Sequence, residues 1–159
     1  MERIEDIDLN ALQTSDDIEY TAFSVACKNG HKYVVQLLLD SKDKNIDFNA
    51  TNTEGYTAFW IACWYGHKDV VKLFLDCSEE ISIDLNAKDE YGRTAFMIAC
   101  YAGHKDAVQL LLQYSEDRNI VLNERGDLGK TAFMIACHSG NINIVKLLGR
   151  SLISIKNCF

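Results

Sequence analysis

The stretch TAFWIACWYGHKDVVKLFL, residues 57–75, decides the fold, because the chain carries three more versions of it. The others are TAFSVACKNGHKYVVQLLL from Thr21, TAFMIACYAGHKDAVQLLL from Thr94 and TAFMIACHSGNINIVKLLG from Thr131, which places the first residues 36, 37 and 37 positions apart. A shared segment precedes them: DFNATNTEGY from Asp47, DLNAKDEYGR from Asp84, VLNERGDLGK from Val121 and a weaker DLNA from Asp8. Similarity at a fixed period predicts an array of stacked structural units.

Each copy has the residues of a turn followed by two helices. The Thr at its start suits a helix N-cap, because its hydroxyl can accept a hydrogen bond from a free amide of the first turn. A Gly ends the first helix in the left-handed conformation, and a stripe of Val and Leu marks the second helix. Gly55, Gly92 and Gly129 suit a tight turn before the Thr, and Asn45 and Asn119 suit a left-handed residue after the second helix. One unit cannot bury its apolar face alone, whereas a stack of units can.

The pattern G-x-T-x-F-x-x-A-C-x-x-G-H-x-x-V-V-x-L-L-L followed by D-L-N-A resembles the ankyrin repeat, over roughly residues 8–150. The resemblance implies an all-α repeat solenoid of stacked helix-turn-helix units with short β-hairpin-like turns. The usual Thr-Pro-Leu-His becomes Thr-Ala-Phe followed by Ser24, Trp60, Met97 or Met134. The segment after each second helix is longer than in the family, and we expect it to form an extra helical turn or a bulged loop away from the hairpin tips.

The repeats predict one elongated domain over residues 1–159. Its parts are an acidic N-terminal segment or partial repeat (1–15), repeat 1 (16–51), repeat 2 (52–88), repeat 3 (89–125), repeat 4 (126–150) and a C-terminal tail (151–159). Solenoids need polar caps at their ends, but the tail keeps apolar residues. Either the tail folds over the last repeat, or the chain belongs to a longer array.

The charge distribution argues against nucleic acid as a partner. The net charge is −7, and seven acids but one base lie within residues 1–19, which leaves 16 acids and 15 bases in the rest. Binding to a phosphate backbone needs a clustered basic surface, and none is visible. The apolar runs are too short to cross a bilayer, and the acidic start lacks the apolar core of a secretory signal. We therefore expect a monomer in the cytoplasm, or in the nucleus, that does not engage membranes.

The cysteines indicate a reducing compartment. Cys27, Cys63, Cys100 and Cys137 occupy the same position in each copy. Equivalent positions of neighbouring helices lie about 10 Å apart, whereas a disulfide needs Cα atoms within about 7 Å. We therefore expect four small buried side chains, with Cys77 and Cys158 outside this register and open to solvent.

No motif for catalysis or for a cofactor is visible. Cys-x-x-x-His recurs from Cys27, Cys63 and Cys100, but the fourth copy has Asn141 in place of His. A closed metal site needs four converging ligands, and each Cys-x-x-x-His pair offers two. We expect each His to bond to backbone across its turn, and we predict neither metal nor cofactor. A phosphate-binding loop and a nucleophile elbow are also lacking, so an enzyme is not predicted.

The resemblance implies a concave surface built from the hairpin tips and the exposed ends of the first helices. The positions that contact partners in the family are here Tyr20, Lys28, Asn29, Tyr56, Trp64, Tyr65, Tyr91, Arg93, Tyr101, Lys130 and His138. The same slots also hold Thr53, Glu54, Glu90, Ala102, Asp127, Leu128 and Ser139. Tyr, Trp and Arg dominate interface hot spots. The sequence therefore predicts a protein–protein interaction module whose partner is another protein.

Two alternatives stay open at this point. One is a non-binding scaffold fragment of a larger multidomain signalling or ubiquitin-ligase adaptor protein, and the other is a metal- or redox-sensing Cys/His protein. Asn49, Asn86 and Asn123 match the hairpin Asn that an asparaginyl hydroxylase modifies in some members of the family. Because the segment before them alters the upstream leucine spacing, we interpret them chiefly as turn-stabilising residues.

Overall fold

A computed structural model describes residues 11, 13–15, 18–41, 46–78 and 80–156. Three features singled out above lie outside these ranges: the DLN of the first DLNA segment, Asn45 and Cys158. The statements that follow concern the described residues.

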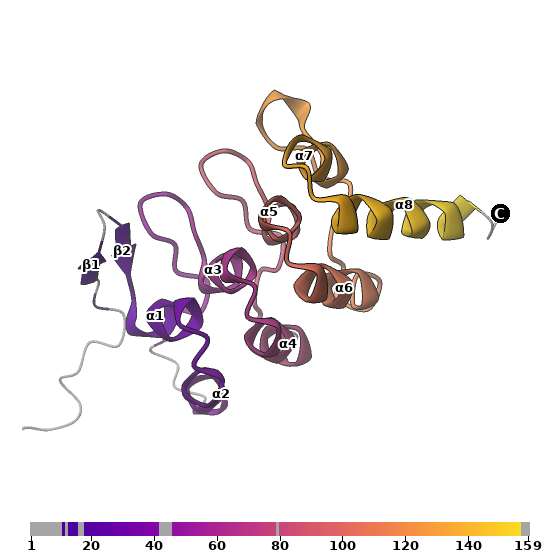
Figure 1. Ribbon diagram of the computed structural model, residues 1–159. Coiled ribbons are helices and arrows are strands. Elements are labelled where there is room, and N and C mark those ends of the chain that lie inside the picture. Colours follow the sequence, from indigo (N-terminus) through magenta and orange to yellow (C-terminus); the bar gives the residue numbers. More distant parts are fainter. Residues whose placement is uncertain (1–10, 12, 16–17, 42–45, 79, 157–159) are drawn as a thin grey trace, which may run out of the picture.

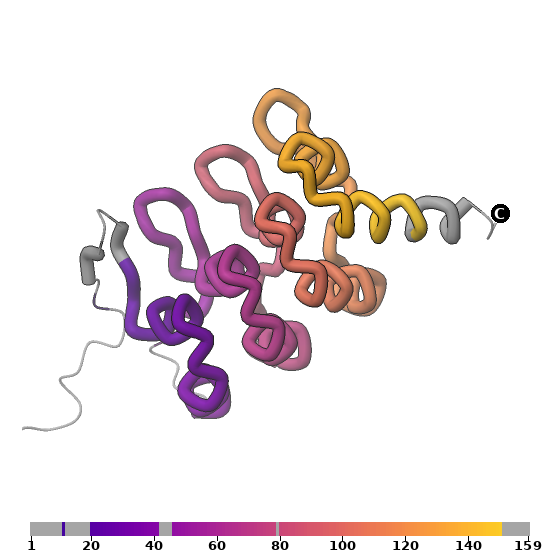
Figure 2. Tube along the Cα trace, in the orientation of Figure 1, coloured from indigo at the N-terminus to yellow at the C-terminus, as the bar shows by residue number. Residues whose placement is uncertain are grey.

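Helix pairs stacked side by side make up the described chain. In order, the elements are β1 (Gln13–Ser15), β2 (Ile18–Tyr20), α1 (Ala22–Lys28), α2 (Lys32–Asp40), α3 (Ala58–Tyr65), α4 (Lys68–Cys77), α5 (Ala95–Ala102), α6 (Lys105–Gln113), the short 3₁₀ turn Asp127–Gly129, α7 (Ala132–His138) and α8 (Ile142–Lys156). Figure 1 shows the first helices in one row, the second helices in another, and the hairpin loops projecting beyond the first row. Figure 2 shows the same two rows of helices and the projecting loops in the Cα trace. The predicted all-α repeat solenoid is confirmed.

The helix ends follow the predicted residues. Thr21, Thr57, Thr94 and Thr131 each accept a hydrogen bond at the side chain from the amide three positions on. Gly66 and Gly103 cap α3 and α5 in the left-handed region, at φ 72° and 79°. The turn glycines Gly55 and Gly92 also have positive φ, as expected. Local sequence therefore determines where each helix starts and stops.

Burial depends on whether a repeat follows. Phe96, Met97 and Cys100 on α5 are buried beneath α7, and their counterparts on α3 are buried beneath α5. Cys137 on α7 is exposed instead. The prediction that all four register cysteines are buried is therefore wrong for Cys137, because no described element covers that side of α7. Cys77 is partly buried, and the five described cysteines are free thiols.

The lengthened segments form hydrogen-bonded turns after α4 and α6. The Ile83 amide donates to Ser78 O at 3.0 Å, and the Ile120 amide donates to Ser115 O at 2.9 Å. Asn119 takes the expected left-handed conformation at φ 51°, and Ser82 does so one repeat earlier at φ 52°. Ile83 and Ile120 are buried, so each extra turn is held against the core.

The hairpin Asn side chains join one repeat to the next. Asn49 Nδ2 donates to Ser82 O at 2.9 Å, and Asn49 Oδ1 accepts from the Asp84 amide at 2.9 Å. Asn86 makes the same pair of bonds one repeat later, to Asn119 O and from the Val121 amide. These residues therefore stabilise the contact between repeats rather than only their own turns.

The His residues after each first helix also reach the preceding repeat. His67 Nε2 lies 2.8 Å from Lys28 O, and His104 Nε2 lies 2.8 Å from Trp64 O. A carbonyl oxygen only accepts, so Nε2 must carry the proton and is not free to bind a metal. The expected bond across the His residue's own turn is wrong, because the acceptor belongs to the neighbouring repeat. Asn141 replaces the His in repeat 4 and donates from Nδ2 to Tyr101 O at 2.7 Å.

The described residues lack a metal-binding cluster and a membrane-spanning helix. They hold no group of three or more His, Cys, Asp or Glu side chains placed to bind a metal ion. Within the same ranges, each helix is too short or too polar to span a bilayer.

The inter-repeat role of the Asn side chains gives a first prediction. Asn86→Ala removes two hydrogen bonds between repeats 2 and 3, each contributing roughly 0.5–1.5 kcal/mol, and should lower the free energy of unfolding by about 1–3 kcal/mol. Asn123→Ala is the matched control, because Asn123 occupies the same slot but is exposed and its side chain makes no hydrogen bond among the described residues. Urea unfolding followed by circular dichroism measures both. Equal losses in the two variants would contradict the proposed bridge.

Candidate functional site

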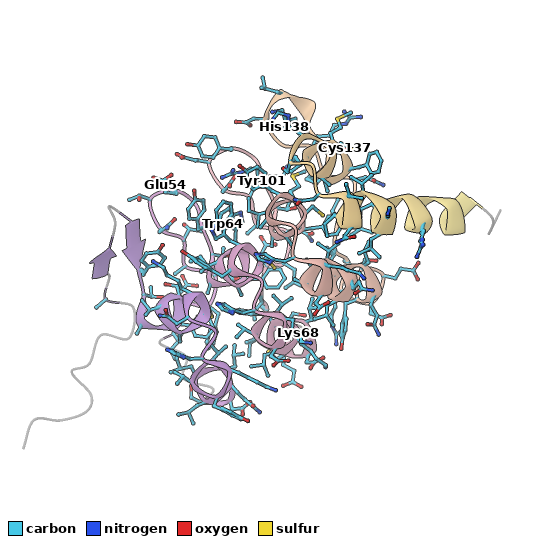
Figure 3. All side chains as sticks on the ribbon, in the orientation of Figure 1. Glu54, Trp64, Lys68, Tyr101, Cys137 and His138 are labelled. Carbon is cyan, nitrogen blue, oxygen red and sulfur yellow. The ribbon has the colours of Figure 1, made fainter. Side chains whose placement is uncertain are left out.

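The hairpin tips of repeats 2, 3 and 4 are hydrogen-bonded to one another. The Glu90 amide donates to Glu54 O at 3.1 Å, and the Asp127 amide donates to Tyr91 O at 3.0 Å. We call the surface formed by these tips and by the C-terminal ends of α3, α5 and α7 the hairpin face. In Figure 3, Glu54, Trp64, Tyr101 and His138 lie along this side of the solenoid, and Lys68 lies on the side of the second helices. The tips therefore form a connected row rather than independent loops.

An acidic or amide side chain shapes the hairpins of repeats 2 and 3. Asn52 Oδ1 accepts from the Glu54 and Tyr56 amides at 3.1 and 2.8 Å. Asp89 Oδ1 accepts in the same way from the Tyr91 and Arg93 amides, at 3.0 and 2.8 Å. Asp89 Oδ2 also accepts from Arg93 Nε at 2.7 Å, and the Asp89 side chain is fully buried in this ion pair. Repeat 4 has Gly126 in this slot and thus no side-chain acceptor.

Leu128 at the tip of repeat 4 is left strained and exposed. It has φ 59°, next to Gly129 at φ 68°, and 92% of its surface is open to solvent. A left-handed conformation costs a residue with a Cβ roughly 1–2 kcal/mol. Backbone strain of this kind concentrates at ligand-binding and catalytic sites. The strained and exposed Leu128 therefore makes the hairpin tip of repeat 4 a candidate binding position.

An aromatic stack runs beneath the hairpins towards this tip. The ring centroids of Tyr56 and Trp60 are 4.0 Å apart, those of Trp60 and Trp64 5.5 Å, and those of Trp64 and Tyr101 5.8 Å, with interplanar angles of 7°, 7° and 18°. Arg93 Cζ lies 4.7 Å from the Tyr91 ring centroid and 5.7 Å from that of Trp60. Tyr101 ends the stack and remains 45% exposed. Its outer face is the part of the stack that a partner can reach.

A groove of about 250 Å³ lies between repeats 3 and 4 at this end of the stack. Tyr91, Arg93, Met97 and Tyr101 line it from repeat 3, and Leu128, Lys130, Ile135 and His138 line it from repeat 4. The structure therefore brings together five of the predicted contact residues: Tyr91, Arg93, Tyr101, Lys130 and His138. Pockets for drug-sized ligands measure about 300–1,000 Å³, so this groove suits one large side chain better than a cofactor.

The remaining predicted contact residues fall outside the groove. Asn29 and Tyr65 are exposed, Lys28 and Tyr56 are half-buried, and Trp64 is packed partly against the core. Because Trp64 is held between Trp60 and Tyr101, its replacement should cost stability as well as binding.

The expectation that Tyr20 is an exposed contact residue is wrong. The sequence places it among the exposed contact residues, but it is only 5% exposed, and Lys28 Nζ lies 4.3 Å from its ring centroid. Tyr20 ends strand β2, which pairs with β1, and its side chain belongs to the core cluster around Phe23. The side chain therefore supports repeat 1 from within and is not available to a partner.

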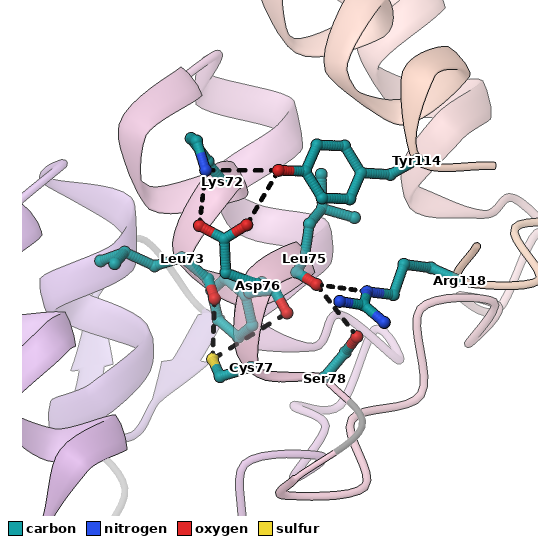
Figure 4. Close-up of polar contacts among 9 residues, drawn as sticks. Lys72, Leu73, Leu75, Asp76, Cys77, Ser78, Tyr114 and Arg118 are labelled. Carbon is teal, nitrogen blue, oxygen red and sulfur yellow. Dashed lines mark hydrogen bonds and ion pairs between the residues drawn. The ribbon is translucent and has the colours of Figure 1, made fainter.

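The opposite side of the solenoid carries a polar network that joins repeats 2 and 3 (Figure 4). Lys72 Nζ lies 2.6 Å from Asp76 Oδ2, and Tyr114 Oη donates to Asp76 Oδ1 at 2.9 Å. Partial burial raises the pKa of Asp76, but the hydrogen bonds from Lys72 and Tyr114 outweigh it and hold the pKa below its ordinary value. Arg118 Nε donates to Leu75 O at 2.7 Å. The polar groups of this network are hydrogen-bonded to one another. The network therefore stabilises the contact between repeats 2 and 3 and is not a candidate ligand site.

The buried thiols are poorly suited to metal or redox chemistry. Burial raises the pKa of Cys100 to about 12, and it raises the pKa of Cys27 and Cys63 as well. The reactive form of cysteine is the thiolate, which is scarce at neutral pH when the pKa is this high. These cysteines act as small apolar side chains between the helices.

The geometry defines a helical-repeat protein that presents a row of linked hairpin tips and one aromatic-lined groove. A family model for ankyrin repeats (3 copies) matches residues 4–89 and 81–157, and the chain belongs to the ankyrin-repeat family. Ankyrin repeats are generally protein–protein interaction modules. A search of curated proteins gave no match.

The buried Asp89 gives a prediction on stability. Asp89→Ala removes three acceptor contacts and leaves Arg93 unpaired, and should cost about 2–4 kcal/mol of unfolding free energy. Asp89→Asn keeps the two backbone bonds, as Asn52 does in repeat 2, and should cost about half as much. Denaturant unfolding of both variants tests the order. An Asn variant as damaged as the Ala variant would show that the ion pair, not the turn, dominates.

The carboxyl groups of Glu54 and Glu90 give a pH-dependent prediction. A hydrogen bond with Glu90 and its negative charge raise the pKa of Glu54. A raised carboxyl pKa means that the folded state favours the protonated form, so this contribution to stability is present at acid pH and is lost as the pH rises through the pKa of Glu54. Glu90→Gln should therefore raise the melting temperature at pH 7 and have little effect near pH 4. Glu80→Gln, an exposed acid away from the tips, is the control, and an equal gain at both pH values would refute the repulsion.

Proposed function

We propose that this chain binds another protein through its hairpin face, with the groove between repeats 3 and 4 as the centre of the interface. The observation that carries the proposal is the exposed end of the aromatic stack at Tyr101, which opens into a groove lined on its other side by Leu128 and Lys130. Aromatic rings and cationic side chains around one central pocket are typical of interface hot spots.

The proposed mechanism is rigid presentation. Tyr101 rests on Trp64, and Arg93 is fixed by Asp89, so a partner meets side chains that are already ordered. Binding then loses little conformational entropy on this side of the interface. The linked tips extend the contact surface towards repeat 2 without a hinge between hairpins.

The partner is proposed to insert one large apolar or aromatic side chain between Tyr101 and Leu128. The volume of the groove, about 250 Å³, fits such a side chain. Lys130 is exposed, and no ion pair engages it among the described residues, so it is placed to meet a carbonyl or carboxylate of the same segment. This chemistry suits a peptide segment or a protein loop, and the chain acts by binding rather than by catalysis.

The compartment is proposed to be reducing, and the cytoplasm fits it. The support is the set of buried free thiols at Cys27, Cys63 and Cys100, whose raised pKa values protect them from oxidation only while the fold is intact. The nucleus satisfies the same requirement.

The binding test compares variants that separate affinity from folding. Binding proteins are captured from the source cell and identified, and the dissociation constant of each purified partner is then measured by calorimetry. Tyr101→Ala should weaken binding at least about tenfold, as expected for a hot-spot aromatic. Leu128→Gly should also weaken binding, yet raise the melting temperature by roughly 2–4 °C because the left-handed strain is relieved.

Tyr33→Ala is the matched control, because Tyr33 is an exposed aromatic on α2, away from the groove. It should leave affinity unchanged. If the partners bind the Tyr101→Ala and Leu128→Gly variants as tightly as the unaltered chain, the groove is not part of the interface. Failure of every candidate to bind the purified chain would remove the function itself.

A further inference from the structure

The two ends of the described solenoid present the two halves of the contact that joins its repeats. Inside the stack, each repeat offers a rear side to the next repeat and a front side to the previous one. The rear side of repeat 4 and the front side of repeat 1 carry the same slots, but no described element covers them. We call these surfaces the rear face (Phe133, Met134, Cys137 and the backbone at His138–Gly140) and the front face (His31, Val34 and Leu37).

The rear face is apolar where interior repeats are buried. Met97 is 1% exposed beneath repeat 4, whereas Met134 in the same slot is 54% exposed. Phe133 and Cys137 are exposed in slots where Phe96 and Cys100 are buried. A Cβ on Gly103 would meet Asn141 Oδ1 at 2.8 Å, but one on Gly140 would meet nothing within 4 Å. The rear face therefore has an open apolar surface and an open site beside its glycine.

The front face offers the complementary groups. Val34 is 48% exposed, whereas Val70 in the same slot of repeat 2 is 1% exposed against repeat 1. Leu37 is exposed where Leu73 packs against the core. His31 occupies the slot from which His67 and His104 donate to the preceding repeat, and no hydrogen bond engages its ring within the described residues.

We propose that the rear face of one copy binds the front face of a second copy, head to tail, through the contact that already joins repeats 3 and 4. His31 of the second copy would lie over Gly140 and donate from Nε2 to His138 O. Val34 would take the position that Ile144 of repeat 4 holds against repeat 3, where it is fully buried. We choose a second copy as the partner of the rear face because of its front face. The front-face residues occupy the positions through which repeats 2, 3 and 4 each contact the repeat before them.

Charge favours the same pairing. Residues 1–19 hold seven acids and one base, whereas residues 140–159 hold Lys146, Arg150 and Lys156 and no acid. The sequence segments that adjoin repeat 1 and repeat 4 thus have opposite net charge, which favours pairing of unlike ends over pairing of like ends. Both partners keep a free face after pairing, so the contact is heterologous and builds open chains rather than a closed dimer. This inference is independent of the proposed function and departs from the monomer that the sequence predicts.

The test is the mass of the full chain in solution over about 10 µM to 1 mM, a range that spans the weak affinity of a small interface. Sedimentation velocity should show a mass that keeps rising with concentration beyond that of a dimer. Met134→Lys blocks the rear face and Val34→Lys blocks the front face, both at exposed positions, and each variant alone should stay monomeric. Circular dichroism verifies that both remain folded.

The decisive sample is an equimolar mixture of the two blocked variants. Only one open front and one open rear face remain in each pair, so the mixture should form a dimer and go no further. Tyr33→Asp is the control, because Asp69 and Asp106 fill that slot in repeats 2 and 3, and it should associate like the unaltered chain. A chain that stays monomeric at 1 mM, a single variant that still dimerises, or a mixture that grows beyond a dimer would each overturn the proposal.

Discussion

The close approach of one repeat's polar side chain to the backbone of the repeat before it is the constraint on which the structure depends. A Cβ on Gly30 would lie 2.6 Å from His67 Nδ1, so only a glycine lets the imidazole lie against the end of the preceding first helix. The ring then reaches the Lys28 carbonyl in the last turn of that helix, where carbonyl oxygens lie beyond the intrahelical hydrogen-bond pattern. The same bond recurs at His104 and, with an amide in place of an imidazole, at Asn141. It sets the offset between neighbouring helices along the whole stack.

That offset brings the aromatic rings into register. The carbonyl that accepts from His104 belongs to Trp64, so the bond fixes the residue whose ring stacks on Tyr101. The groove beside Tyr101 exists because repeat 4 departs from the other hairpins. Gly126 replaces the capping Asn or Asp, a Cβ there would lie 3.2 Å from Gly92 O, and without a side-chain acceptor the turn places Leu128 in the left-handed region. Close approach of two hairpins and exposure of one leucine thus have a common cause.

Local chemistry made much of this structure predictable from the sequence. Thr caps, positive-φ glycines and the register of the Val and Leu stripe depend on residues near in the chain, and each was found where the sequence placed it. Contacts between repeats are harder to predict, because the identity of a residue does not show whether a neighbouring repeat covers it. Tyr20 and Cys137 have the opposite of their expected environments: Tyr20 is buried in the core cluster that includes Phe23, and Cys137 is exposed on a side of α7 that no described element covers. The direction of the His bonds and the conformation of Leu128 likewise depend on groups a repeat away.

The thiols show how one slot acquires different properties along a quasi-one-dimensional stack. Cys100 and Cys137 have the same neighbours on their own helices, Ala99 and Ala136, and differ in what lies beyond. Burial under repeat 4 raises the pKa of Cys100 to about 12, whereas Cys137 is open to solvent. In a solenoid each repeat contacts only its neighbours, so stability and reactivity are sums of local terms plus contacts across each junction. Among the described residues, repeats 1 and 4 have one such junction each and the middle repeats have two, so local opening should be easiest in repeats 1 and 4. A partner bound in the groove would therefore stabilise repeat 4.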